Sequence, residues 1–196
     1  MERDRYSAVA VMLHWIIAIL LVWTVLLAWQ AEDLKGAAKM VPLQLHKPLG
    51  IVILLLTLAR LAWRAVHRPP PLGPGLKPWE RRLAHAVHWG FYGLMLLVPL
   101  TGWAMVSASS LIVRYPIDMF GLFDWPVIQP LFDLPETVRH DRHELLEEIH
   151  KLMAKAIIYG LIPLHVLGAL KHQFLDRDNS LSRMIPFLAR RQGEAA

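Results

Sequence analysis

Four of the ten histidines in this sequence are placed where imidazole rings could hold a cofactor inside a membrane. His14 lies about 9 Å inside the start of the first apolar run, and His165 lies about 14 Å from the end of the last one. These two are at matched depths and can face each other. His46 and His150 open their apolar runs at the opposite end, so they can also face each other. Two neutral imidazoles on different helices are what the iron of a six-coordinate haem requires.

The spacing of two histidines on the last apolar run predicts that one helix holds two haems at different depths. His150 and His165 are 15 residues apart, which places them about 22 Å apart along a helix and about 60° apart in direction. Gly50 lies one turn after His46, and Gly168 lies three residues after His165. The missing side chains would let a flat macrocycle approach, although glycines in membrane helices also serve plain helix packing.

The chain that carries these histidines has the composition of an integral membrane protein. Of its 196 residues, 55% are hydrophobic and only 19% are charged, which is too apolar for an ordinary soluble domain. We expect an all-α, integral membrane four-helix bundle that forms one domain over residues 1–196. Its spans are the four apolar runs of about 20 residues each, enough to cross a hydrocarbon core of about 30 Å: residues 8–29, 45–66, 83–106 and 150–174.

Two other kinds of site are disfavoured by the residues present. The sequence has no cysteine, which excludes disulfides, iron–sulfur clusters and the covalent attachment of c-type haem. A histidine-rich bundle could instead transport a metal ion, but the apolar runs contain no Asp or Glu to neutralise a divalent cation. Any haem would therefore be held without a covalent bond to the chain.

The loops differ in charge, and the difference predicts the orientation in the membrane. Basic residues dominate after the second and fourth runs, whereas the other two loops are mixed or acidic. Basic loops stay on the cytoplasmic side, so we expect both termini inside (N-in, C-in). Anionic membrane lipid accounts for the clustered basic residues and the net charge of +5, so we expect no nucleic-acid partner. The basic residues of these two segments include Arg64, Arg68, Lys77, Arg81, Arg82, Arg177, Arg183, Arg190 and Arg191.

Two connectors have recognisable features. Residues 67–78, HRPPPLGPGLKP, contain too many prolines and glycines for a helix and predict a tight, extended connector on the cytoplasmic side. Residues from Ser107 to about Arg142 form the one sizeable segment outside the apolar runs. We expect this segment to be a periplasmic cap between the third and fourth helices, lying on the membrane surface with a short interfacial helix.

Several stretches resemble, in order, the successive motifs of the bacterial cytochrome b561 family. They are LHWIIAILL, QLHKPLGIVILLLTLARLAWR followed by PPPLGP, AHAVHWGFYGLMLLVPLTGW, MFGLFDWP and LHVLGALKHQFLDRDNSLSRMIP. The resemblance implies a multi-pass protein of the bacterial inner membrane that binds two b-type haems and exchanges electrons with the quinone pool. Some members resemble superoxide:ubiquinone oxidoreductases. The four haem ligands of the family fall on His14, His46, His150 and His165.

The sequence departs from the family pattern in the last helix, where the two ligands are usually one residue closer together than His150 and His165 are. A single-residue π-bulge near Pro163 would restore the facing direction, because proline frees a backbone carbonyl. Without such a bulge the assignment of His150 weakens, and His143 or His140 would be the substitutes.

Further candidates lie near the cytoplasmic end of the predicted bundle. His172 is two turns after His165 on nearly the same face, beside Lys171, where a quinone headgroup would need a proton donor. The alternative for His172 is an interfacial histidine bonded to lipid or water. His85 and His88 open the third run and could line the same pocket or bond to lipid headgroups.

Two basic side chains need an anionic partner. Arg60 lies in the cytoplasmic half of the second run, a costly place for a charge unless it is paired. A haem propionate or a lipid phosphate would pair it. Lys47, next to His46, could bind a propionate of the other haem.

We therefore expect a membrane oxidoreductase in which an electron enters at a periplasmic haem and leaves to ubiquinone at a cytoplasmic haem, or the reverse. Superoxide fits as donor, because basic residues attract a small anion over the acidic background. The alternative is a haem-bearing membrane anchor subunit that serves a periplasmic dehydrogenase or hydrogenase. A homodimer is compatible with either function. The basic residues expected near the donor side are Lys39, Lys47, Arg114, Arg139 and Arg142.

Overall fold

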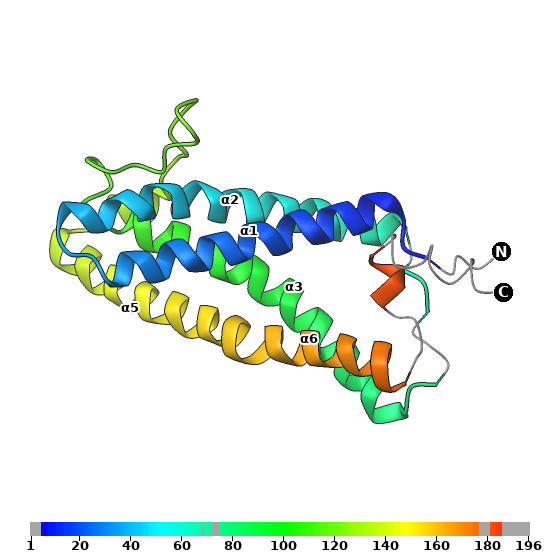
Figure 1. The fold of residues 1–196 in the computed structure, drawn as a ribbon. Helices are drawn as coiled ribbons and strands as arrows, with labels where there is room; N and C mark the ends of the chain where they lie inside the picture. The colour runs from blue at the N-terminus through cyan, green and yellow to red at the C-terminus, as the bar shows by residue number, and fades with distance from the viewer. Residues whose placement is uncertain (1–4, 68, 72–74, 177–180, 186–196) are drawn as a thin grey trace.

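The computed structural model of the protein consists of helices that run side by side along one long axis (Figure 1). It describes residues 5–67, 69–71, 75–176 and 181–185. In this part of the chain four helical stretches are long and apolar enough to cross a membrane: Ala8–Glu32, Ala37–Val66, Pro78–Ser107 and Glu136–Leu175. The predicted all-α bundle of four membrane helices is confirmed.

The first three of these stretches are single α-helices, and the fourth changes its winding along its length. The single helices are α1 (Ala8–Glu32), α2 (Ala37–Val66) and α3 (Pro78–Ser107). The fourth stretch runs from α5 (Glu136–Lys155) through the π-helical η1 (Ala156–Leu161) and α6 (Ile162–Leu170) to the π-helical η2 (Lys171–Leu175). Two short elements are α4 (Gln129–Phe132) and the 3-10 turn η3 (Leu181–Arg183).

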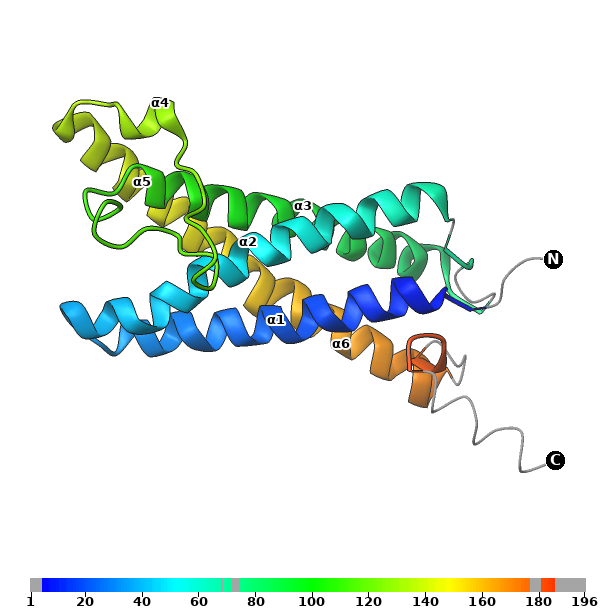
Figure 2. The same cartoon turned by 90° about the horizontal axis from the view of Figure 1, so that it is seen from above.

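The helices pack as two pairs. The antiparallel α1 and α2 contact each other along their lengths, α3 packs against α5, and α2 and α3 join the pairs (Figures 1 and 2). Ile17, Ile53 and Met95 form the buried centre between them. Large apolar side chains also point outward, such as Ile19 and Leu152, which are 63% and 69% exposed. Membrane hydrocarbon would cover this outer surface.

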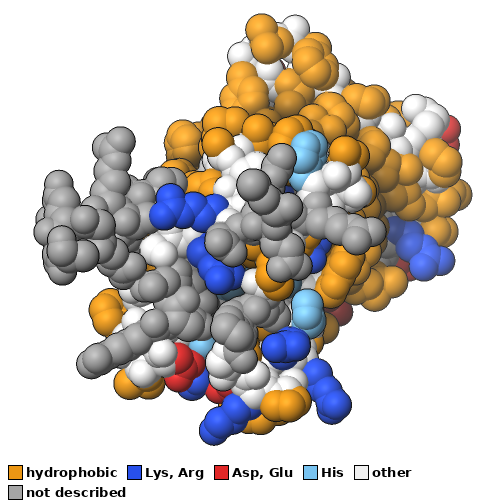
Figure 3. Space-filling view, turned by 90° about the vertical axis from the view of Figure 1, so that its right-hand side faces the viewer, with side chains coloured by type: hydrophobic (Ala, Val, Ile, Leu, Met, Phe, Trp, Pro, Cys, Tyr) orange, Lys and Arg blue, Asp and Glu red, His pale blue; other side chains and the backbone are white. Residues whose placement is uncertain are grey.

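The two ends of the bundle differ. The start of α1, the end of η2 and the α2–α3 connector lie together at one end, which we call the terminus end (Figure 1). The α1–α2 turn and the segment from residue 108 to 135 lie at the opposite end, which we call the loop end. Lys and Arg side chains gather at the terminus end (Figure 3). This distribution is the basis for the expected N-in, C-in orientation, which stays a prediction.

Three helices begin before the apolar runs that predicted them. α2 starts at Ala37 and not at residue 45, α3 at Pro78 and not at 83, and the fourth stretch at Glu136 and not at 150. Hydropathy marks only the apolar part of a helix, whereas helical winding continues into polar sequence where i,i+4 pairs support it. In α5, Lys151 Nζ lies 2.6 Å from Glu147 Oε1, which is such a pair.

The helix boundaries at the terminus end follow local sequence signals. The Ser7 hydroxyl accepts a hydrogen bond from the Ala10 backbone N–H at 3.3 Å and thereby caps α1. At α3, Pro78 occupies the first turn, and the Glu80 carboxylate accepts the Lys77 backbone N–H at 2.9 Å. As predicted, the described residues of the α2–α3 connector form no helix or strand.

The predicted cap segment contains the short helix α4 and a tight turn, and a partly buried lysine holds it. Gly121, at φ 77°, donates its backbone N–H to Asp118 at 2.7 Å within that turn. Lys47 Nζ donates to the carbonyls of Tyr115 and Pro116 at 2.7 and 2.8 Å. The loop is thereby attached to α2 one residue after His46. Its position over the periplasmic side stays a prediction.

Candidate functional site

The fold brings the four predicted ligand histidines together as two pairs. His14 on α1 faces His165 on α6 with ring centroids 6.1 Å apart, nearer the terminus end. His46 on α2 faces His150 on α5 with ring centroids 6.3 Å apart, nearer the loop end. We call them the terminus-side pair and the loop-side pair. The structure thus gives the pairing by depth that the sequence predicts, while the role of each ring as a ligand stays a prediction.

The separation within each pair fits a metal between the rings. An imidazole nitrogen binds a transition metal at about 2 Å, and the ring centre lies about 1 Å beyond it, so two axial rings have centroids about 6 Å apart. The observed 6.1 and 6.3 Å match this value. Both pairs therefore have the separation that a bis-histidine haem requires.

Each of the two sites offers two facing histidines. In the described part of the chain, no group of three or more His, Cys, Asp or Glu side chains could hold a metal ion. A structural or catalytic zinc site takes three or four protein ligands. A haem iron needs only axial ligands from the protein, and a facing pair supplies them.

The loop-side pair is oriented by the backbone. His46 Nδ1 lies 2.9 Å from the Thr24 carbonyl, and His150 Nδ1 lies 2.9 Å from the Val98 carbonyl. A carbonyl only accepts, so each Nδ1 carries the ring proton and each Nε2 has a free lone pair. This is the usual arrangement of a metal-binding histidine, whose other nitrogen donates to a carbonyl or carboxylate.

A glycine that the sequence analysis did not select makes room for His150. A Cβ built on Gly102 would lie 3.1 Å from Cε1 and 3.2 Å from Nδ1 of the His150 ring. The ring therefore packs directly on the α3 backbone, and the neighbouring Thr101 hydroxyl lies 3.4 Å from Nδ1. Gly102 belongs to the stretch LTGW. Hydropathy and histidine spacing do not show which glycine a ring contacts, so the sequence did not single it out.

The terminus-side pair is held by a charged side chain. Arg60 Nη1 lies 2.9 Å from His14 Nδ1. A guanidinium is always a donor, so Nδ1 accepts this bond and the proton of a neutral His14 ring is on Nε2. Binding of a metal by Nε2 therefore requires the His14 proton to move and Arg60 to donate to another acceptor.

Arg60 has the surroundings of a cation that needs an anion. It lies within α2, with its guanidinium carbon 5.8 Å from the Tyr92 ring centre and a buried Nε that has no hydrogen-bond partner. Among the described residues, no carboxylate forms an ion pair with it. A charge inside a membrane span is costly unless it is paired. A haem propionate bound at this level would supply the missing anion.

The structure separates the two histidines at the start of α3. His88 packs edge-on against His165, with ring centroids 5.5 Å apart, and Phe91 does the same on the next turn at 5.5 Å. His85 is exposed on the outer surface of α3. Of the two, only His88 can act at the terminus-side pair, whereas His85 fits the alternative of contact with lipid headgroups.

Two predicted glycines lie beside open space in the protein. A Cβ at Gly50 or Gly168 would meet no protein atom within 4 Å. Gly50 is one turn from His46, and Gly168 is one turn from His165, so both positions suit the close approach of a flat macrocycle. Their role at the cofactor stays a prediction.

The winding of the last helix changes between its two histidines. The π-helical segment η1, Ala156–Leu161, lies between His150 and His165 and ends just before Pro163. Hydrogen bonds from i to i+5 accommodate an extra residue within a helical turn. The bulge that the long histidine spacing requires is therefore present, slightly earlier than the predicted position near Pro163.

Apolar side chains separate the two pairs. The buried cluster of Ile17, Ile53 and Met95, with Leu20, Leu56 and Phe91 packed against it, fills the middle of the bundle. Ile17 is one turn after His14, and Phe91 also contacts His165. Apolar side chains therefore fill the space between the pairs.

His172 and Lys171 belong to an ionic cluster at the terminus end. Lys171 Nζ lies 2.7 Å from Glu80 Oε1 and 2.6 Å from Asp176 Oδ2, and so joins α3 to the end of η2. His172 Nδ1 lies 2.7 Å from the same Asp176 oxygen. The hydrogen bond from Lys171, with the nearby His172, holds the pKa of Asp176 below its usual range. Two carboxylates thus balance the Lys171 charge, which weakens its expected role beside an anionic quinone.

Three other candidates have partners in the protein. Lys47 uses two of its three ammonium protons on loop carbonyls, so at most one remains for a propionate. His143 Nδ1 donates to the Met105 carbonyl at 2.8 Å, and His140 is paired with Glu144. Neither His143 nor His140 makes a ring contact with His46, so His150 stays the partner of His46.

Comparison with known proteins identifies the relatives of this chain. The family model described as "Prokaryotic cytochrome b561" matches residues 5–187. A protein of Yersinia pestis named "Probable superoxide oxidase CybB" is 33% identical over 94% of this chain and 97% of its own length. "Cytochrome b561 homolog 2" of Escherichia coli (strain K12) is 29% identical over 93% of this chain and 92% of its own length. "Cytochrome b561 homolog 1" of the same organism is 26% identical over 93% and 98%.

Proposed function

The chain belongs to the prokaryotic cytochrome b561 family, and we propose that it binds two b-type haems and carries electrons across the inner membrane between a periplasmic donor and the quinone pool. The observation that carries this proposal is the presence of two facing histidine pairs, with centroids 6.1 and 6.3 Å apart, at two levels of the bundle. A redox-inactive membrane protein would have no need of two such pairs.

Each pair would bind one haem. His14 and His165 would be the axial ligands near the terminus end, with Arg60 on a propionate, and His46 and His150 the ligands near the loop end. Gly50 and Gly168 would allow the macrocycles to approach, and Gly102 positions the His150 ring. When bound, the haems supply one-electron redox chemistry, while the protein supplies ligands, a dry interior and charge.

The terminus end has the residues for proton transfer to a quinone. Reduction of a quinone to a quinol takes up two electrons and two protons, so a proton donor must contact the headgroup. His172 lies seven residues after His165, about 10 Å further along the helix, and is therefore too far to bind the same iron. Its Nδ1 is 2.7 Å from the Asp176 carboxylate, which orients the ring. His88 contacts the His165 ring, with ring centroids 5.5 Å apart.

We propose superoxide as the donor at the loop end, on the strength of the relative named a superoxide oxidase. Two superoxide anions would each lose one electron to give two O2, and one quinone would gain both electrons and two protons. Basic side chains would attract the anion by electrostatic steering. The candidates on that side are Lys39, Lys47, Arg114, Arg139 and Arg142.

Quinone reduction by the purified protein tests this function. Superoxide supplied in solution should drive the formation of quinol from a soluble ubiquinone analogue, and the His46→Ala and His165→Ala variants should lose this activity. If the intact, haem-loaded protein formed no quinol from superoxide, that donor would be wrong. Quinol formation that required an added periplasmic dehydrogenase or hydrogenase would identify the protein as a haem-bearing anchor subunit.

A further inference from the structure

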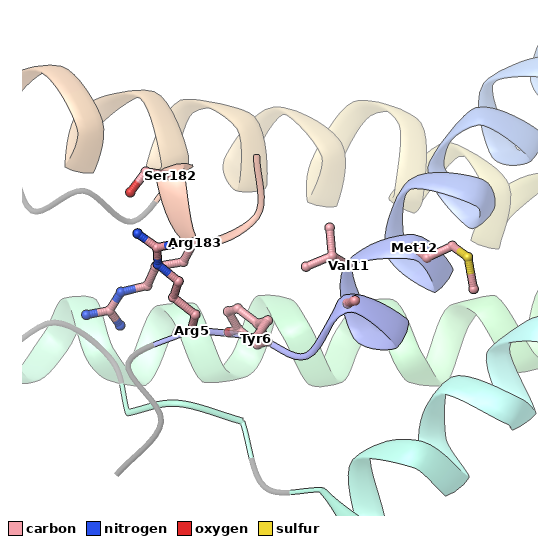
Figure 4. A pocket seen from close by; sticks show the side chains of 7 residues that line it. Arg5, Tyr6, Val11, Met12, Ser182 and Arg183 are labelled. Carbon is pink, nitrogen blue, oxygen red and sulfur yellow. The ribbon is translucent and has the colours of Figure 1, made fainter. Parts of the chain in front are cut away.

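A pocket at the terminus end is lined by opposite ends of the described chain. It has a volume of about 330 Å³ and lies between the start of α1 and the 3-10 turn η3 (Figure 4). Its two sides differ in chemistry: the arginine, tyrosine and serine side chains lie on one side, and aliphatic side chains of α1 lie on the other. The lining residues are Arg5, Tyr6, Ala8, Val11, Met12, Ser182 and Arg183.

On the polar side of this pocket, the described lining residues carry positive charge and no negative charge. None of the seven described residues that line it has a carboxylate. Arg183 Nη1 donates to the Pro71 carbonyl at 2.8 Å, which uses one of its five N–H groups. Arg5 makes no ion pair with any carboxylate in the described part of the chain. Two guanidinium groups beside one cavity repel each other unless an anion lies between them.

Three arginine side chains act electrostatically on Tyr6, which lines the pocket. Burial raises the pKa of the Tyr6 hydroxyl, while the guanidinium groups of Arg64, Arg183 and Arg60 act in the opposite direction. Two of these three arginines lie outside the pocket lining, so the positive charge extends beyond the cavity. An anion in the pocket would interact favourably with all of them.

The apolar side of the pocket continues onto the lipid-facing surface of α1. Met12, on that side, is 55% exposed. Two indole N–H groups lie at the same level: Trp15 donates to the Met184 carbonyl at 2.8 Å, and Trp63 donates to the Ser7 hydroxyl at 2.9 Å. Tryptophan at the end of a membrane helix marks the depth of the lipid headgroups. The pocket is therefore at the level where a lipid phosphate lies above its acyl chains.

We propose that this pocket binds the phosphodiester of an anionic phospholipid from the cytoplasmic leaflet, with Arg5 and Arg183 on the phosphate and the acyl chains along Val11 and Met12. Guanidinium groups bind phosphate oxygens through paired hydrogen bonds. Basic pockets between membrane helices on the cytoplasmic side favour anionic headgroups. The bound lipid joins the segment before α1 to η3 and stabilises the terminus end.

A quinone headgroup fits this pocket less well than a phosphate. Its carbonyl oxygens are neutral and gain less from two guanidinium groups. Neither of the groups that would deliver a proton to it, His172 and His88, lines the pocket. The lipid pocket and the proposed quinone region are thus distinct.

Lipid titration of the purified, haem-loaded and delipidated protein, followed by native mass spectrometry, tests this proposal. The three probes are phosphatidylglycerol, phosphatidylcholine and inorganic phosphate. We expect phosphatidylglycerol to bind at least about tenfold more tightly than either of the others. Arg5→Gln should weaken phosphatidylglycerol binding about tenfold, the effect of one charged hydrogen bond, and Arg81→Gln, a control at the same end, should not change it.

Further variants and competitors distinguish a lipid site from a free-phosphate site and from a quinone site. Arg183→Gln also removes the bond to Pro71, so Arg183→Lys, which keeps the charge, should retain more lipid binding than Arg183→Gln. Equal binding of the two lipids, or an Arg5→Gln variant that binds as the parent does, would overturn the proposal. Displacement of the lipid by an equal concentration of inorganic phosphate would identify a free-phosphate site. Displacement by a ubiquinone analogue would place the quinone here.

Discussion

The terminus-side and loop-side pairs use the same two side chains at nearly the same separation, but their surroundings differ. At the loop end both rings donate to backbone carbonyls, of Thr24 and Val98. At the terminus end a guanidinium donates to His14, and His165 packs against other rings, among them that of His88. One site is oriented by backbone groups and the other by a charged side chain.

This difference indicates a division of roles between the two ends. A helix carbonyl cannot move without breaking the helix, so the loop-side rings keep one tautomer and one orientation. At the terminus end, a positive charge favours the reduced form of a nearby redox centre, because reduction removes positive charge from the iron. In the proposed function, Arg60 would therefore favour electron transfer toward the terminus end, where His172 would supply a proton.

The largest expected effect is the loss of one haem from a ligand variant. His165→Ala should remove the terminus-side haem and largely spare the loop-side haem, and His46→Ala should do the opposite, because the buried apolar cluster of Ile17, Ile53 and Met95 separates the sites. A redox titration followed by the visible spectrum should show one component in each variant. Equal loss of both components from either change would leave the two-site model without support.

The next largest effect concerns the proposed proton donor at the terminus end, His172. His172→Ala should leave both haem spectra intact and slow haem oxidation by quinone about 100-fold, the usual size of a lost general acid. Asp176→Asn should slow it less, because the imidazole remains. His85→Ala is the matched control, since that ring is exposed on α3. Unchanged turnover in His172→Ala would reject the role, and loss of a haem would mean that His172 is a ligand.

The sequence predicted the membrane helices and the two histidine pairs. It did not predict the groups that orient the rings of each pair. Hydropathy and depth were enough to pair His14 with His165 and His46 with His150, because a helix rises by a fixed amount per residue. The carbonyls of Thr24 and Val98 could not be found in this way, since every residue has a carbonyl and only packing selects one. Three of the four helix starts were predicted too late, because polar residues continue these helices beyond the apolar runs.

The sequence also failed to predict which partners two kinds of residue contact, the glycines and the lysines. Gly50 and Gly168 were selected for their distance from a histidine, but the glycine in contact with a ring is Gly102, which lies on a helix that carries no predicted ligand. Lys47 and Lys171 were selected for their neighbours in sequence. In the structure, Lys47 holds the loop and Lys171 joins α3 to η2, because long side chains reach partners that the sequence does not place nearby.

A smaller effect tests whether the loop-side ring depends on its packing. Gly102→Ala places a Cβ about 3.1 Å from the His150 ring and should weaken loop-side haem binding about tenfold to 100-fold, as the loss of an orienting contact does. The terminus-side haem should be unaffected. Gly93→Ala, on the same helix with nothing within 4 Å, is the control. Haem dissociation measured by transfer to an acceptor protein would show the difference, and equal effects of both variants would contradict it.

The smallest effect concerns the charge at the terminus end. Arg60→Gln should lower the potential of the terminus-side haem by up to about 60 mV, a tenfold change for one electron, and shift the loop-side potential much less. Arg60→Lys keeps the charge and should recover part of the difference. Potentiometric titration of the three proteins measures this. A potential that rose, or two potentials that moved together, would contradict the proposed division between the ends.

The count of haem per chain tests the central claim most directly. A pyridine haemochromogen assay of the purified protein, set against a protein concentration from quantitative amino-acid analysis, gives this ratio without any assumption about donor or acceptor. The two facing histidine pairs, at 6.1 and 6.3 Å, predict two b-type haems per chain. A ratio near one, or near zero, in a folded protein would contradict the account.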